Sequence, residues 1–397
     1  MGRWQFATAG QILFGRGAAS EAAALVSGFG SRVLVVTGLA PGRAAWLIDD
    51  LAARGCECAT LHAGHEPDLA LARDGAEAAR RARIQVVVGV GGGSALDAAK
   101  AIAALATNDG DPLDYLEVVG RGLPLRTAPL PCVAIPTTAG TGSEVTRNAV
   151  LAVPEHRIKV SLRDPRMLPR AAVVDPDLTC ALPPDLTAQT GLDALTQLIE
   201  PFLSVRATPL VDALCRDGIR RVARSLRAAC INGRDAAARE DMSLASLFGG
   251  LALANAGLGA VHGLAGPIGG MFPAPHGAVC AALLPHVTAA NLRALRARAP
   301  ASEALSRIGE VAQLLTGRAG ASADEAMIWL ADLVRDLAIP RLSAWGITPA
   351  DLTEIVSQAA RSSSMKGNPV ALADDELVAV LAAATGFRGR GAHGDAP

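Results

Sequence analysis

A cluster of glycines between a hydrophobic run and a helical stretch constrains this chain more than any other feature. The run Ile84-Gln-Val-Val-Val88 predicts a buried strand, and Gly89-Val-Gly-Gly-Gly93 leads directly into a helical stretch that begins at Ser94. Glycines let a ligand approach the backbone with no Cβ in the way, and the free N–H groups at a helix start favour an anion. This order predicts a parallel βα unit whose turn holds a phosphate or pyrophosphate.

Two polar segments have both a structural and a ligand-binding interpretation. Ser94 and Asp97 have the spacing of a capping box, in which Ser94 caps the helix and Asp97 reaches back. The loop 136–146 follows the predicted strand 131–135 and contains four threonines, a serine and two glycines. Such a loop at the end of a parallel strand supplies hydroxyls and amides for a ribose, phosphate or carboxamide, although a plain turn with Ser/Thr caps is the alternative.

The hydrophobic pattern predicts an α/β domain followed by an all-helical domain. A chain of 397 residues, 50% of them hydrophobic, exceeds the roughly 250–300 residues at which one core stops growing. Strand-like runs alternate with helical stretches in the first half, which predicts an N-terminal Rossmann-like domain with a mainly parallel sheet. We expect domains at 1–182 and 183–385 and a flexible tail at 386–397. The predicted strands are 32–37, 84–88 and 131–135, and the predicted helices are 42–55, 69–83, 186–204, 208–229, 235–256 and 301–315, with one more from Ser94.

Charge and cysteine content exclude several classes of partner. The formal net charge of -1 leaves no overall field for holding nucleic acid or an anionic membrane surface. No run of 18 apolar residues and no signal-peptide pattern occurs, so we expect a cytoplasmic protein with no membrane partner. The cysteines form no CxxC pair, which predicts reduced thiols that mostly lie in the core. They are Cys56, Cys58, Cys132, Cys180, Cys215, Cys230 and Cys280.

A carboxylate and two histidines have the composition of a divalent-metal site. Asp193 and Gln197 are four residues apart in a helical stretch and therefore share one helix face. His262 and His276 are each flanked by a glycine, His276 also by a proline. One carboxylate and two imidazoles are the minimal protein ligands of a divalent metal that keeps open positions. A histidine taken singly is more often structural, and we interpret the others in this way: His62, His65, His156, His286 and His393.

Together these segments resemble the iron-containing (group III) alcohol dehydrogenase family, whose wider fold group includes glycerol dehydrogenase and dehydroquinate synthase. The resembling motifs run in family order from about residue 6 to 385. The resemblance implies a dinucleotide domain, a helical metal domain, a cleft between them that holds a small-molecule substrate, and a homodimer. The motifs are Phe14-Gly-Arg-Gly17, Gly91 to Lys100, Pro136 to Glu144, Val174-Asp-Pro176, Gly191 to Thr196, the His262 segment and Pro275-His-Gly277.

The resemblance also implies roles for single residues. A divalent metal, iron or zinc, would be held by Asp193, His262 and His276, with Gln197 either completing the shell or hydrogen-bonding the substrate oxygen, and these four form the expected catalytic group. The cofactor, NAD or NADP, would be contacted by Gly92, Gly93, Ser94, Asp97, Thr137, Thr138, Thr141 and Lys159, with Gly38 and Asp68 at two further cofactor positions.

Four positions depart from the family pattern. Gln197 stands where the family usually has histidine, and an amide oxygen is a poorer ligand than imidazole for a borderline metal. Gly266 stands where many members have a histidine thought to relay the proton. Gly38 stands where NAD-preferring members often have aspartate, so no carboxylate repels a 2′-phosphate and NADP becomes admissible. Asp68 occupies a position that the family usually fills with asparagine.

We therefore expect a metal-dependent alcohol dehydrogenase or aldehyde reductase that transfers hydride between NAD(P) and a small alcohol or aldehyde. Three alternatives stay open. Gln197 favours a metal-independent enzyme of the maleylacetate reductase kind. A carbon–oxygen lyase like dehydroquinate synthase would handle a phosphorylated acid, against which the single lysine of the helical half, Lys366, argues. A non-catalytic descendant would bind the nucleotide without turnover.

Overall fold

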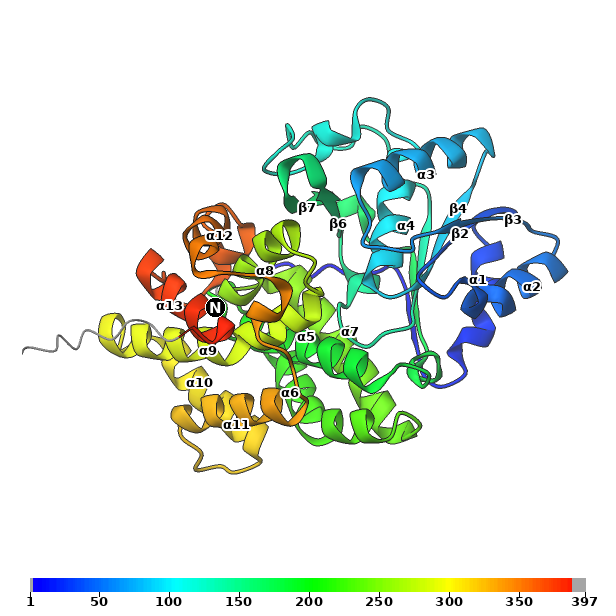
Figure 1. Cartoon of the computed structure of the whole chain (residues 1–397). Coiled ribbons are helices and arrows are strands. Elements are labelled where there is room, and N and C mark those ends of the chain that lie inside the picture. The colour runs from blue at the N-terminus through cyan, green and yellow to red at the C-terminus, as the bar shows by residue number, and fades with distance from the viewer. Residues whose placement is uncertain (1–2, 388–397) are drawn as a thin grey trace, which may run out of the picture.

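The computed structural model describes residues 3–387, and a six-stranded sheet organises the first half of the chain (Figure 1). The strand order is β1-β8-β5-β4-β2-β3, and every neighbouring pair is parallel. An antiparallel hairpin, β6 and β7, forms a second small sheet. The predicted α/β class is confirmed. The strands are β1 Ile12–Phe14, β2 Arg32–Thr37, β3 Glu57–His62, β4 Val86–Gly91, β5 Cys132–Pro136, β6 Asn148–Val153, β7 Ile158–Arg163 and β8 Ala171–Val174.

Helices cover both faces of the large sheet. On β2, Val33 and Val35 belong to the core beneath α1 and α2, whereas Leu34 and Val36 belong to the core beneath α3 and α4. Successive side chains of a strand point to opposite faces, so a strand covered on both sides needs an unbroken hydrophobic run. The helices are α1 Ala22–Ser27, α2 Ala45–Ala53, α3 Leu69–Arg81 and α4 Gly93–Leu105.

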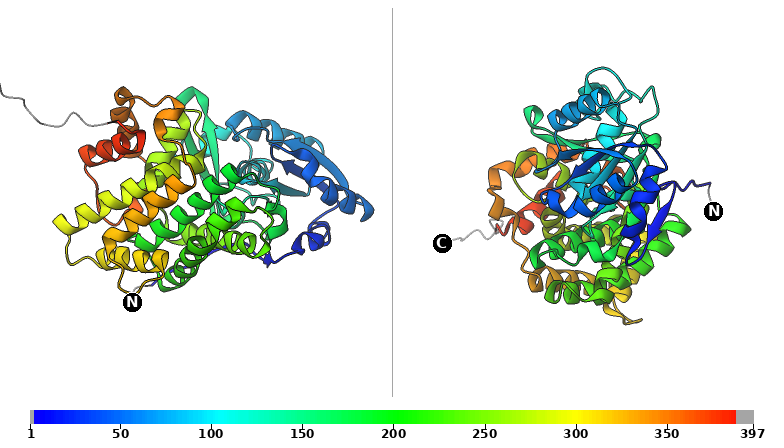
Figure 2. Two further views of the ribbon diagram at one scale, coloured as in Figure 1. Left: turned by 60° about the horizontal axis from the view of Figure 1, so that its bottom comes forward. Right: turned by 90° about the vertical axis from the view of Figure 1, so that its right-hand side faces the viewer.

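Between residues 183 and 387 the structure describes only helices and their connections, as Figure 2 shows in green to red beside the sheet. Helix α5 is central, because it packs against α6, α7 and α9. These helices share one large hydrophobic core. They are α5 Pro184–Leu203, α6 Pro209–Ile231, α7 Ala236–Ala256, α8 Ala260–Met271, α9 His276–Arg298, α10 Glu303–Thr316, α11 Ala323–Asp336, α12 Leu352–Ala359 and α13 Asp374–Thr385.

Helix α9 is long and apolar enough to cross a membrane by length and composition. However, 83% of its apolar window is buried inside the protein. Packing in the helical core therefore accounts for its apolar sequence.

The predicted helices 186–204, 208–229 and 235–256 agree with α5, α6 and α7 to within two residues at each end. The division into domains at residue 182 coincides with the start of α5 and stays a prediction. Residues 388–397 of the predicted flexible tail lie outside the described residues.

One loop ties the sheet to the helical half. Gly142, in the loop after β5, has a φ of 59°, a conformation that favours glycine. A Cβ at this position would lie 2.4 Å from the Cα of Gly250 in α7. Because neither backbone can give way, two facing glycines are needed for the loop to touch the helix. This contact sets how the loop faces the helices of the second half.

Candidate active site

The carboxyl ends of β4 and β5 open into a cleft of about 730 Å³ between the sheet and the helical half. Ligands of open parallel sheets bind at this edge. Nine of the ten predicted cofactor residues line the cleft: Gly38, Gly92, Gly93, Ser94, Asp97, Thr137, Thr138, Thr141 and Lys159. On the opposite side it is lined by the predicted metal residues Asp193, Gln197, His262 and His276.

The glycine turn, residues 89–93, and the threonine loop, residues 136–146, are in direct contact at the sheet side of the cleft. Helix α4 begins at Gly93 and is capped by Gly92. A Cβ on Gly93 would lie 2.7 Å from Cγ2 of Thr141, so only glycine allows this approach. The first N–H groups of α4 face no preceding helical turn and are therefore free to bind an anion. The geometry fits a dinucleotide pyrophosphate.

The capping box predicted for Ser94 and Asp97 is wrong. Asp97 accepts hydrogen bonds from the Ser143 hydroxyl at 2.5 Å and from the backbone N–H of Val150 at 3.0 Å. It also pairs with the buried ammonium of Lys100, 3.0 Å away. Because Gly92 caps the helix through its own extended backbone, the Asp97 carboxylate instead holds Ser143 of the threonine loop and Val150 of β6 against α4.

Three of the cofactor predictions have different outcomes. Asp68 is absent from the cleft wall that the structure describes, and its carboxylate caps α3 by accepting the N–H of Leu71 at 2.8 Å. Lys159, on β7, lines the cleft and forms an ion pair with Glu66. Gly38 also lines the cleft, and a Cβ there would come no closer than 3.9 Å to a neighbour, Cβ of Ala95.

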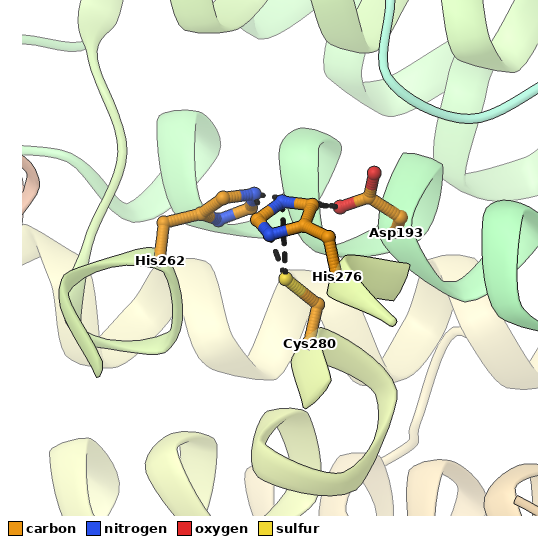
Figure 3. Close-up of side chains that lie close together, drawn as sticks. All are labelled: Asp193, His262, His276 and Cys280. Atoms are coloured by element: carbon orange, nitrogen blue, oxygen red, sulfur yellow. Dashed lines mark hydrogen bonds and ion pairs between the residues drawn. The ribbon is translucent and has the colours of Figure 1, made fainter. Parts of the chain in front are cut away.

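Three helices bring four potential metal ligands together, and Figure 3 shows their side chains pointing toward one another. The ligand atoms of Asp193 on α5, His262 on α8, and His276 and Cys280 on α9 all lie within 4.8 Å of one another. Oδ1 of Asp193 is 3.4 Å from Nε2 of His262 and 3.7 Å from Nε2 of His276. Sγ of Cys280 is 3.8 Å and 3.6 Å from the same two nitrogens. The predicted convergence of Asp193, His262 and His276 is thus present in the structure.

Local breaks in the chain place both histidines near helix starts. The chain bends by 99° between α7 and α8, at a break that contains Gly257 with a φ of 71°. His262 is the third residue of α8, and His276 is the first residue of α9, directly after Pro275. Proline suits the start of a helix because its φ is already fixed. These breaks turn both imidazoles toward α5.

Glu200 orients His262 from behind. Its Oε2 is 2.7 Å from Nδ1 of His262, and its Oε1 accepts the backbone N–H of Val261 at 2.7 Å. A carboxylate facing Nδ1 keeps the proton on that nitrogen and leaves the lone pair of Nε2 facing the cluster. Because Glu200 is only 6% exposed, the pair is shielded from solvent. Carboxylate–histidine pairs of this kind are the usual support of a metal ligand.

Buried oxygen atoms without partners indicate that the cluster fits a cation. Among the described residues, Oδ1 of Asp193 and Oε1 of Gln197 are buried and accept no hydrogen bond. An unpartnered buried carboxylate oxygen is costly unless something positive sits against it. Gly266, which stands where many family members have a histidine thought to relay the proton, lines the same cleft, and a Cβ there would meet no described atom within 4 Å. The residues present therefore fit a divalent metal with open space beside it.

The electrostatics of the cluster also favour a positive charge. Burial opposes the charged form of His276, yet Cys280 and Asp193 raise its pKa to about 9. Burial likewise opposes the charged form of His262, but Cys280, Glu200 and Asp193 raise its pKa. Burial favours the neutral form of Asp193, but the two imidazoles hold its pKa below the ordinary value. A cluster that retains protons in this way also attracts a metal cation in their place.

Sequence reasoning missed two residues of this site. Cys280 follows His276 by four residues, and Glu200 follows Asp193 by seven, so each shares a helix face with a predicted ligand. Both spacings were visible in the sequence. Only the packing of α5, α8 and α9 shows that these faces meet.

The chain matches two descriptions of one family along most of its length. "Iron-containing alcohol dehydrogenase" matches residues 9–176, and "Fe-containing alcohol dehydrogenase family, C-terminal" matches residues 187–385. Alcohol dehydrogenase 4 of Saccharomyces cerevisiae is 40% identical over 316 residues, which are 79% of this chain and 80% of that protein. The crystal structure of a 1,3-propanediol oxidoreductase has a TM-score of 0.89 and 33% identity, covering 96% of this chain and 100% of the other.

A second solved structure is similar and holds a cofactor. Sulfoacetaldehyde reductase from Bifidobacterium kashiwanohense, in complex with NAD+, has a TM-score of 0.83 and 29% identity, covering 97% of this chain and 99% of the other. The matches confirm the expected class, an oxidoreductase that uses NAD(P) and a divalent metal. The chain belongs to the iron-containing alcohol dehydrogenase family.

Proposed function

We propose that this enzyme transfers hydride reversibly between NAD or NADP and a small primary alcohol or its aldehyde. One observation carries the proposal: Asp193, His262 and His276 converge on a wall of the cleft whose facing wall is the glycine turn. Hydride transfer requires the substrate oxygen to be held on one side of the carbinol carbon and the nicotinamide on the other. The cleft provides one binding surface for each.

On the sheet side, the chain binds and orients the cofactor. The N–H groups at the start of α4 bind the pyrophosphate between Gly93 and the facing Thr141. Thr137 and Thr138 supply hydroxyls on the same wall, and Lys159 lines the cleft as an ion pair with Glu66. These contacts direct the nicotinamide toward α5.

On the helical side, Asp193, His262 and His276 hold the metal, which when bound supplies a Lewis acid for the substrate oxygen. Glu200 fixes the tautomer of His262. Gln197 accepts a hydrogen bond from the substrate hydroxyl through its unpartnered Oε1. Because Gly266 offers no imidazole, the proton leaves through water or a threonine hydroxyl such as that of Thr138.

The names of similar proteins support a small substrate. They are an alcohol dehydrogenase, a 1,3-propanediol oxidoreductase and a sulfoacetaldehyde reductase. We infer that this enzyme acts on short alcohols and aldehydes.

The test is absorbance at 340 nm with metal-loaded enzyme, either cofactor, and a series of primary alcohols and aldehydes. We expect turnover, loss of turnover on chelation, and recovery when the metal is returned. His276→Ala should lose metal and turnover while it still binds NADH, because His276 lies on the metal wall of the cleft. Full activity of metal-free enzyme would support the metal-independent alternative instead. Cofactor binding with no net absorbance change for any substrate would indicate the lyase or the non-catalytic binder.

We also propose that the enzyme is a cytoplasmic homodimer. Strand β1 is at the edge of the sheet, where its outer backbone groups are available to a second copy. All seven cysteines are free thiols, as is usual in a reducing compartment. Light scattering at assay concentration tests the dimer, for which a monomer mass would be contrary evidence, and cell fractionation tests the location.

A further inference from the structure

We propose that Cys280 is a metal ligand, a thiolate that completes the shell where Gln197 replaces the expected histidine and that makes the site favour zinc over iron(II). The inference rests on the metal role of this site proposed above and adds the identity of the fourth ligand. From the sequence, Cys280 is interpreted as one of the reduced thiols that mostly lie in the core.

The position of Cys280 on α9 aims its side chain at the cluster. His276 opens α9 and Cys280 follows one turn later, so the two side chains lie on the same helix face. Sγ approaches Nε2 of His276 at 3.6 Å and Nε2 of His262 at 3.8 Å. These are the nitrogens that face the cluster, since Nδ1 of His262 is taken by Glu200.

Four of the six separations within the cluster lie close to the edges of a zinc tetrahedron. Zinc binds thiolate sulfur at about 2.3 Å and imidazole nitrogen at about 2.0–2.1 Å, so a tetrahedral angle puts sulfur and nitrogen about 3.6 Å apart and oxygen and nitrogen about 3.3–3.4 Å apart. The sulfur–nitrogen separations are 3.6 Å and 3.8 Å. The oxygen–nitrogen separations, from Asp193, are 3.4 Å and 3.7 Å. All four atoms lie within 4.8 Å of one another, so one small ion in the middle would bind them after small shifts of the side chains.

A role in packing alone explains the position of Cys280 less well. Cys280 and Cys215 both belong to the core of the helical half, and both are fully buried. Burial raises the pKa of the Cys215 thiol, as expected for an inert core cysteine. Cys280 differs because its sulfur joins a cluster of ligand-type atoms, the one cluster of three or more His, Cys, Asp or Glu groups that the described residues form.

The ligand set determines which metal is favoured. Imidazole suits both zinc and iron, whereas thiolate is a soft ligand typical of zinc sites and a neutral amide oxygen binds such metals weakly. Gln197 has a buried, unpartnered Oε1 as well, so it is the competing candidate for the fourth position. With sulfur in that position, Gln197 stays available to the substrate.

The test uses cobalt(II) as a spectroscopic probe in cofactor-free protein. Cobalt bound to a thiolate has a near-ultraviolet charge-transfer band that oxygen and nitrogen ligands do not produce. We expect this band in the wild type and in Gln197→Ala, and its loss in C280S and C280A. C215A is the matched control, because it removes a buried cysteine from the same core without touching the cluster, and it should keep the band.

Metal competition gives the second measurement. C280S should lower zinc affinity at least about tenfold, the lower end of the loss typical when even an outer partner is removed. The same variant should lower iron(II) affinity less, so the zinc-to-iron preference falls. A cobalt-loaded wild type without the band, or a C280S variant whose zinc affinity stays within twofold, would overturn the inference.

The failure of this inference is distinguishable from failure of the proposed function. If C280S is unchanged while His276→Ala loses both metal and turnover, the metal enzyme stands and Cys280 is a packing residue. If the wild type binds no stoichiometric metal yet turns over, the metal role itself is wrong and this inference falls with it.

Discussion

Replacing Glu200 by glutamine tests whether the carboxylate that orients His262 determines metal affinity. The two carboxylate oxygens of Glu200 serve two N–H groups, the backbone N–H of Val261 and Nδ1–H of His262, each at 2.7 Å. Glutamine has the same shape but only one acceptor oxygen. The backbone N–H can only donate, so the amide oxygen turns to Val261 and the NH₂ group faces Nδ1. His262 must then carry its proton on Nε2, the nitrogen that faces the cluster.

The expected loss of zinc affinity follows from this change in hydrogen bonding. Either His262 adopts the wrong tautomer, or the Val261 N–H is left buried without a partner at a cost of about 1–3 kcal/mol. Loss of such a supporting partner typically weakens metal binding about 10–100-fold, which corresponds to about 1.4–2.8 kcal/mol. E200Q should therefore bind zinc about 10–100-fold more weakly while it remains folded, because no volume is lost.

Zinc affinity is measured by titration against a chelator of known affinity, with circular dichroism to check the fold. Glu144→Gln is the matched control, since Glu144 is another buried glutamate, 2% exposed, outside the cluster. If folded E200Q binds zinc within twofold of the wild type, the orientation of His262 by Glu200 does not matter and the reasoning is refuted.

Three further predictions concern the cofactor and the fold. Gly38→Asp has room for its side chain, with no neighbour closer than 3.9 Å to the new Cβ. Repulsion of about 1–2 kcal/mol between the new carboxylate and the 2′-phosphate, at a screened site, should lower kcat/KM with NADP about 5–30-fold relative to NAD. Equal losses with both cofactors would contradict this. Gly93→Val puts a Cβ 2.7 Å from Cγ2 of Thr141 and should raise the Kd of NADH at least about tenfold with metal content unchanged, as calorimetry can show. Burial raises the pKa of Glu144 to about 7, partly offset by Lys100; because this folded-state pKa lies above the ordinary value of 4.5, the stability that the protonated form provides is complete below about pH 4.5 and is lost as the pH rises through 7. The difference in unfolding free energy between Glu144→Gln and the wild type should therefore grow from pH 5 to pH 8 by up to about 3 kcal/mol. Thermal melts across this pH range measure it, and parallel pH profiles of Tm for the two proteins would count against it.

The sequence predicts the central strands of the sheet well and its edges poorly. Strands β2, β4 and β5 are buried on both faces, so each shows an unbroken hydrophobic run that needs no neighbour to be recognised. Strand β3 is an edge strand with the sequence ECATLH and is half exposed. Strand β1 has only three residues. Short or edge strands are defined by the partner that pairs with them, which periodicity cannot show.

The site divides in the same way between what is local and what depends on packing. The glycine turn is a local feature, because its backbone freedom and its helix start lie within one short segment. Asp97 shows the limit of local spacing, because it has the spacing of a cap yet binds Ser143 and Val150, about 50 residues away. Cys280 and Glu200 likewise gain their meaning only from the helices that face them.

The loop after β5 combines a local sequence feature with contacts to distant parts of the chain. Thr141 contacts the glycine turn, Gly142 packs on Gly250 of α7, and Ser143 binds Asp97 of α4. Lys100, buried beneath the loop, donates to the carbonyl of Ser143 at 2.9 Å and so fixes its backbone from the sheet side. Three successive residues therefore touch the cofactor turn, the helical half and the helix behind the turn. Hydride transfer depends on the distance between the nicotinamide and the carbon held at the metal wall, so the contacts that position this loop bear on the reaction as well as the ligands do.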